Sequence, residues 1–137
     1  MKHESKLIWT GEMAFETEID GHKLILDAAV EADGHNSGMR PKKLMLTALA
    51  GCTGMDVISI LKKMKIVPDE FNVRVDGNVT DEHPKQYDSM HIIYEFKGDN
   101  LPEDKLIKAI ELSQEKYCGV SAVYKKAMKV TYEIRML

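Results

Sequence analysis

At 137 residues the chain has the length of one domain and can bury a hydrophobic core without disulfide or metal cross-links. Hydrophobic residues make up 44% and charged residues 30%, a composition typical of a soluble globular protein. The formal net charge of -3 excludes an electrostatic argument for binding nucleic acid or an anionic membrane, because both select clustered Lys and Arg.

The first third of the chain is predicted to form strands. Three short apolar-bearing runs are separated by glycine-containing turns: residues 6–9, 13–19 and 23–28. The Asp20–Gly21 pair between the last two runs is a strong hairpin signal. Residues 31–39 combine two glycines with an asparagine, and we expect a loop there.

A long helix is predicted from about Pro41 to Met64 or Lys65, since proline suits the first helical turn. Apolar residues cover nearly its whole circumference, and small residues fill its middle, so we expect it to be buried almost all round. Polar residues interrupt the apolar run, and no apolar leader segment is visible at the start of the chain. We therefore expect a cytoplasmic protein without a membrane span.

The second half predicts a hairpin, a helix and a last strand. Two extended runs are followed by an amphipathic helix, a short helical turn and an alternating strand: residues 71–79, 90–96, 102–117, 121–127 and 128–136. The predicted order is βββ-α-ββ-α-β, an α+β fold with a long buried central helix. No linker or repeat appears, so we expect a single domain over residues 1–137.

Few residues outside the cysteines carry a chemical signal. No nucleotide-binding glycine motif is present, and the five histidines lack metal-ligand spacing. A metal site that combines His35 or His91 with a cysteine is the remaining metal possibility, and we expect no metal and no cofactor. The acidic residues near the end of the third run (Asp27, Glu31 and Asp33) are expected to be solvated or capping.

The two cysteines have distinctive surroundings. Cys52 is predicted midway along the long helix, and Cys118 at the end of the second one. In a reducing compartment such residues are either buried packing groups or redox groups. Cys52 lies too far along its helix for the N-terminal dipole to lower its pKa, so a thiolate there needs a cation. Arg40 and Lys42, about three turns earlier, are candidates, and a partner subunit is another source.

The long helix and the segment before it resemble a known family. Residues 38–66 read GMRPKKLMLTALAGCTGMDVISILKKMKI, and residues 117–121 read YCGVS. The first stretch is similar to the central-helix signature of the OsmC/Ohr superfamily (osmotically inducible protein C and organic hydroperoxide resistance protein). The second is similar to the family's later motif, a cysteine followed closely by Val-Ser. The predicted order of elements agrees over essentially the whole chain.

This resemblance implies an intertwined homodimer with its active sites at the subunit interface. It implies a thiol peroxidase acting on organic hydroperoxides in oxidative stress defence. Cys52 would become a sulfenic acid, and Cys118 would resolve it as a disulfide that a dithiol reductant, such as a lipoylated protein, then reduces. The chemistry is consistent, since a sulfenic acid needs a nearby thiol to escape over-oxidation.

The chain departs from the family pattern at the activating pair. The residue after the proline, a Glu in peroxidase members, is Lys42 here, and Arg40 is the first arginine of the chain. Either Arg40 or Lys42 stabilises the Cys52 thiolate directly, or the chain belongs to a divergent branch of the family whose peroxidase activity is weak or absent. Two other hypotheses stay open: a small-molecule-binding or redox-sensing protein without peroxidase turnover, and a protein in which both cysteines only pack.

Overall fold

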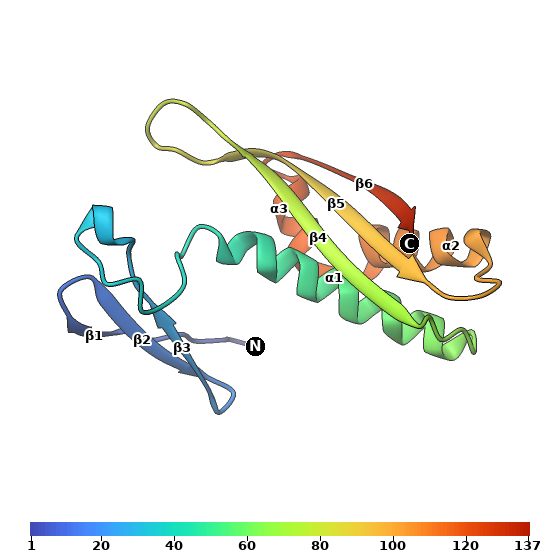
Figure 1. Ribbon diagram of the computed structural model, residues 1–137, viewed down its shortest axis with the longest axis horizontal. Coiled ribbons are helices and arrows are strands. Elements are labelled where there is room, and N and C mark those ends of the chain that lie inside the picture. Colours follow the sequence, from blue (N-terminus) through green and yellow to red (C-terminus); the bar gives the residue numbers. More distant parts are fainter. The chain divides into compact units, whose positions relative to one another are not determined.

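The computed structural model describes all 137 residues, which divide into two compact units, Met1–Met45 and Leu46–Leu137. The elements follow the order βββ-α-ββ-α-β, with short helical turns added, which is the predicted α+β plan (Figure 1).

The first unit is a three-stranded antiparallel sheet followed by a loop. Its strands pair in the order β1-β2-β3, with these bounds: β1 Ile8–Gly11, β2 Ala14–Ile19 and β3 His22–Leu26. Asp20 and Gly21 connect β2 to β3, and both have positive φ angles (52° and 80°). Positive φ at both central residues is the geometry that a tight two-residue hairpin needs, so the hairpin prediction is confirmed.

Asp27 organises the loop after β3. Its carboxylate accepts hydrogen bonds from the backbone N–H groups of Ala28, His35 and Ser37 and from the Ser37 hydroxyl. These four donors hold the pKa of Asp27 far below its ordinary value, the Ser37 hydroxyl contributing most. The side chain is buried, so the expectation of a solvated or capping residue is half right: it stabilises the loop from inside.

The second unit is a sheet packed against helices. Its strands are β4 (Glu70–Val79), β5 (Tyr87–Lys97) and β6 (Lys129–Met136), in the order β4-β5-β6. β5 pairs antiparallel with β4 and parallel with β6, so it is the central strand. The helical segments are α1 (Leu44–Lys63), α2 (Glu103–Leu112), the π-helical turn η2 (Ser113–Tyr117) and α3 (Gly119–Lys125).

The hydrophobic core lies wholly in this second unit. It joins one face of α1 and α2 to β5, and its fully buried members include large side chains from all three elements: Leu49, Val57, Leu61, Ile92, Tyr94, Phe96, Leu106 and Ile110. Phe71 of β4 stacks on Phe96 with ring centroids 4.7 Å apart. β4 is an edge strand, and its sequence alternates between apolar and polar residues. β5 is the central strand, and its sequence is a nearly continuous apolar run.

Two predictions about the long helix need correction. α1 begins at Leu44, not at Pro41, because residues 41–43 form a tight turn in which the Leu44 N–H bonds the Pro41 carbonyl. It is also not buried all round, since Met55 and Ile58 are 74% and 42% exposed. The rest of the chain therefore buries only one face of α1.

By length and composition α1 is apolar enough to cross a membrane, a test that the core helices of soluble proteins also pass. Its buried face joins the hydrophobic core with β5 and α2, so it is a partly buried core helix.

Candidate redox site

Cys52 lies on the face of α1 that meets the core. It follows Leu49 by one turn and precedes Asp56 by another, because residues four apart share a helix face. Its thiol is half-buried and free, and the side chain packs at the edge of the hydrophobic core. The thiol is therefore supported by the core and still reachable from outside it.

Cys118 is positioned by an irregular helix end. α2 runs into the π-helical turn, and the Cys118 N–H bonds the Ser113 carbonyl at 2.7 Å, a span of five residues. Cys118 then caps α3, where its Sγ accepts the Ser121 N–H at 3.4 Å. The wide turn and the cap together fix the position of the Cys118 thiol, and the residue is only 3% exposed.

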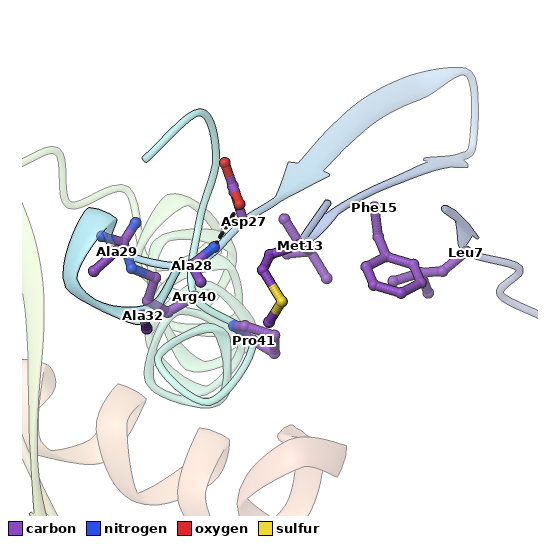
Figure 2. Close-up of a pocket in the computed structure, with 10 residues that line it drawn as sticks. Leu7, Met13, Phe15, Asp27, Ala28, Ala29, Ala32, Arg40 and Pro41 are labelled. Atoms are coloured by element: carbon purple, nitrogen blue, oxygen red, sulfur yellow. Dashed lines mark hydrogen bonds between the residues drawn. The ribbon is translucent and has the colours of Figure 1, made fainter. Parts of the chain in front are cut away.

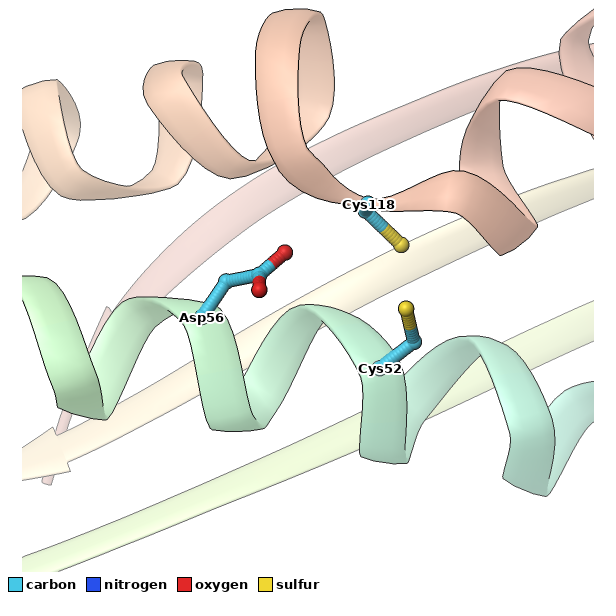
Figure 3. A group of neighbouring side chains, drawn as sticks. All are labelled: Cys52, Asp56 and Cys118. Carbon is cyan, nitrogen blue, oxygen red and sulfur yellow. The ribbon is translucent and has the colours of Figure 1, made fainter.

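The structure brings the two cysteines together. Their Sγ atoms and a carboxylate oxygen of Asp56 all lie within 4.8 Å of one another. In Figure 3 the two thiols point toward each other from α1 and from the segment before α3, with Asp56 beside them. The two thiols are therefore neighbours in space although they lie far apart in the sequence.

Burial distinguishes the two thiols. It raises the pKa of Cys118 to about 11, and the neighbouring Cys52 and the charge of Asp56 raise it further, against the Ser121 N–H. Cys118 is thus a protonated thiol at neutral pH and a weak nucleophile as it stands.

A buried network of polar side chains supports this site from behind. The Thr53 hydroxyl bonds the Tyr94 hydroxyl at 2.6 Å and the Ser113 hydroxyl at 2.8 Å. The Ser113 hydroxyl also donates to Asp56 Oδ2 at 2.9 Å. Because Thr53, Tyr94 and Ser113 are fully buried, each hydrogen bond satisfies groups that water cannot reach.

Gln114 links that network to the Cys118 side. Its Nε2 donates to Thr53 and Tyr94, and its Oε1 accepts the Ser121 hydroxyl at 2.7 Å. Burial raises the pKa of Tyr94 to about 12, although bonds from Thr53 and Gln114 oppose the shift. The network is therefore neutral over the physiological range and holds Asp56 as its one charged end.

Sequence reasoning missed Asp56 and the polar residues behind it. The signal for Asp56 was present, since an acidic residue four positions after Cys52 on a predicted helix must share its face. Ser113 and Gln114 had no such signal, because the π-helical turn that contains them follows no residue pattern.

Arg40 and Lys42, the predicted cations, belong to the first unit. The Arg40 guanidinium donates to Asn36 Oδ1 at 2.7 Å and to the Gly38 carbonyl at 3.0 Å. Lys42 is exposed in the turn before α1. No Lys, Arg or His is among the groups that shift the pKa of Cys118.

Arg40 also lines an apolar cavity of about 780 Å³ within the first unit (Figure 2). Met13, Phe15 and Pro41 face it in Figure 2, and Leu7 and several alanines complete its wall. A cavity this large with an apolar wall is typical of a small-molecule site or of a surface that another chain covers.

Neither histidine singled out from the sequence joins a cysteine. His35 contacts Glu12, and His91 bonds Thr131 and Glu133 on β6. Two thiols and one carboxylate are one ligand short of the four in a closed structural zinc site, and we assign them to thiol chemistry.

Comparison with known proteins shows what the chain is similar to. The family model described as OsmC-like protein matches residues 34–133, the segment that contains both cysteines and Asp56. Protein YhfA of Escherichia coli K12 is 26% identical over 98% of each chain.

Two solved structures show the same fold over nearly the whole chain. A hypothetical protein from Aquifex aeolicus is 28% identical, with a TM-score of 0.83 over 100% of this chain and 99% of that one. An organic hydroperoxide resistance protein OsmC from Legionella pneumophila is 16% identical, with a TM-score of 0.67 over 97% of both chains.

Proposed function

The chain belongs to the OsmC-like family, and from that membership we propose that it is a thiol-dependent peroxidase that reduces organic hydroperoxides. The observation that carries the proposal is the pair of free thiols whose sulfurs lie within 4.8 Å. The hydroperoxide resistance protein from Legionella pneumophila, similar in fold, supports the choice of substrate class.

The difference in burial assigns the two roles. Cys52, the more accessible thiol, attacks the terminal peroxide oxygen as a thiolate; the O–O bond breaks, the alcohol leaves with a proton, and Cys52 becomes a sulfenic acid. Cys118, buried and protonated, then attacks the Cys52 sulfur, and water leaves as the disulfide forms. A dithiol reductant, such as a lipoylated protein, restores both thiols by exchange.

The cation that stabilises the Cys52 thiolate is part of the proposal. Arg40 and Lys42 remain the candidates, from this chain or from a second copy. Replacing each by alanine tests them: loss of the bimolecular rate with hydroperoxide, at unchanged melting temperature, identifies the residue that acts.

We also propose that the protein acts as a homodimer in which both units form one domain. All buried apolar residues lie in the second unit, whereas the first exposes large apolar side chains on its short sheet, among them Ile8, Trp9 and Ile19. Met55 and Ile58 on α1 are exposed as well. Exposed apolar surface on this scale is typical of an interface with another chain, here a second copy.

Turnover of an organic hydroperoxide tests the peroxidase proposal. With cumene hydroperoxide and a dithiol in excess, we expect steady turnover by the wild type and none by Cys52→Ser. Without the dithiol, Cys118→Ser should reduce one equivalent of peroxide and stop, with a sulfenic acid that a dimedone probe traps. Undiminished turnover by Cys52→Ser contradicts the proposal.

The cavity of the first unit supports a second candidate function, the binding of a small apolar molecule without peroxidase turnover. Fluorescence of 1-anilinonaphthalene-8-sulfonate measures occupancy of this cavity. Met13→Asp, which places a charge in the cavity wall, should abolish the signal, and Val30→Asp outside the wall should preserve it. Equal signals from both variants reject this function.

A further inference from the structure

Asp56 is the only carboxylate whose oxygens approach both thiols. We propose that Asp56 is the acid–base residue of the disulfide step: it takes the proton of the Cys118 thiol as the disulfide forms, and it delivers a proton to Cys118 on reduction. The inference rests on the proposed function and extends it, because it assigns a role to a residue outside the cysteines and their activating cation.

The carboxylate is oriented for that role. Ser113 donates to Oδ2, and Ser113 is itself held by Thr53, which is held by Tyr94. This chain of buried hydroxyls binds one carboxylate oxygen and leaves Oδ1 without a hydrogen bond from the protein. Figure 3 shows the carboxylate projecting from α1 toward the segment that carries Cys118.

Cys118 needs a proton acceptor to react. Burial raises its pKa to about 11, so the thiolate is a small fraction of the population near pH 7. The Ser121 N–H bonds the sulfur but cannot take a proton. Cys52, the third member of the group, is consumed as the sulfenic acid, which leaves Asp56 as the acceptor within reach.

Asp56 also connects the thiols to solvent. It forms part of the wall of a small cavity of about 270 Å³, together with Ser59, Lys63 and Tyr117. Lys63 and Tyr117 are the titratable groups that face Asp56 from this side, and Tyr94 and Tyr124 are those that surround Cys118. Among these groups only Asp56 is in place to exchange a proton both with a thiol and with solvent.

The step balances without any further reactant. The Cys118 sulfur forms a bond to the Cys52 sulfur, the S–O bond of the sulfenic acid breaks, and the leaving hydroxide becomes water. Asp56 accepts the Cys118 proton and passes it to that hydroxide, so it ends as a carboxylate. In reduction, a thiol of the dithiol attacks Cys52 and gives its proton to Asp56, which passes that proton to the departing Cys118 thiolate.

The reductive half can be tested without peroxide. The wild type, Asp56→Asn and the control Asp99→Asn, an exposed loop residue, are oxidised to the disulfide with diamide. Reduction by dithiothreitol is then followed by acid quench and thiol counting from pH 5 to pH 10. Circular dichroism and melting temperature monitor folding, and Asp56→Glu serves as the conservative variant.

We expect Asp56→Asn to slow reduction near pH 7 by about 100-fold, the usual contribution of a positioned acid–base group. The deficit should shrink as the pH rises toward the pKa of Cys118, because the sulfur can then leave as a thiolate and no longer needs a proton from Asp56. Asp56→Glu should recover part of the wild-type reduction rate, and the control Asp99→Asn should be reduced at the wild-type rate.

Equal rates for Asp56→Asn and the wild type at every pH overturn the proposal, as does a deficit that is independent of pH. Failure of the wild type to form an intramolecular disulfide with diamide overturns it too. Because no hydroperoxide is present, a protein that passes this test and leaves hydroperoxide untouched contradicts the proposed peroxidase function alone.

Discussion

The two units of the chain are stabilised in different ways. The second unit, Leu46–Leu137, contains every buried apolar side chain of the protein, whereas the buried side chains of the first are those of the polar residues Thr17 and Asp27. A three-stranded sheet without a covered apolar face is marginal in water. The redox site is therefore built where the chain packs on itself, and the proposed second copy would cover the apolar side chains that the first unit exposes.

The largest effect is expected from the core of the second unit. Leu61→Ala removes a fully buried side chain and should lower the free energy of unfolding by about 2–5 kcal/mol. Val67→Ala, at a side chain 81% exposed, is the matched control and should change it by less than about 0.5 kcal/mol. Urea denaturation at a fixed protein concentration measures both, and equal losses would contradict the placement of the core.

In the first unit we expect the largest loss of stability from a substitution that disturbs the backbone of the loop after β3. A Cβ at Gly34 would overlap the Ala28 backbone carbonyl, so Gly34→Ala should cost about 1–3 kcal/mol. Gly119→Ala, where a Cβ meets no atom within 4 Å, is the control and should be neutral or slightly stabilising. Melting temperatures decide the matter; a neutral Gly34→Ala would mean that the loop is not held as described.

The need for a second copy can be tested on α1. Met55→Glu places a charge on the exposed apolar face and should raise the dimer dissociation constant about tenfold or more, equivalent to about 1.4 kcal/mol. Val67→Glu introduces the same charge elsewhere and should leave the constant unchanged. Sedimentation equilibrium measures both variants, and a wild-type protein that is monomeric at all concentrations would disprove the dimer.

A smaller and pH-dependent effect is expected at Asp27. Its pKa is lowered in the folded chain, so its contribution to stability is present above the ordinary Asp pKa and is lost as the pH falls below that value. Asp27→Asn should therefore lower the melting temperature at pH 7 and differ little from the wild type at strongly acid pH. A difference that does not change with pH would show that the ionised carboxylate is not what holds the loop.

The sequence predicted much of this architecture, for identifiable reasons. Alternation in residues 71–79, the Asp20–Gly21 turn and the apolar spacing of the helices are local patterns, and each produced the expected element. The juxtaposition of Cys52 and Cys118 came from the family resemblance, because 66 positions separate them in the chain. Neither source revealed the π-helical turn or the Asp56–Ser113 hydrogen bond, which depend on how α2 ends against α1.

The expectation of an all-round buried helix failed for a physical reason. Apolar periodicity reports which faces of a helix avoid water, without distinguishing cover by the same chain from cover by another. Leu49, Val57 and Leu61 are covered by the core of the second unit, and Met55 and Ile58 are not. The apolar pattern of α1 was therefore recognised correctly, but the expectation that the rest of the same chain covers all of it was wrong.

The central claim is that Cys52 and Cys118 act as one redox pair, and intact mass spectrometry tests it most directly. Reduced protein is mixed with one equivalent of an organic hydroperoxide, quenched with acid and weighed beside Cys52→Ser and Cys118→Ser. The account predicts rapid loss of two hydrogen atoms and of both free thiols in the wild type. It predicts one added oxygen in Cys118→Ser and no change in Cys52→Ser. A wild-type protein that keeps its mass and both thiols would contradict the account.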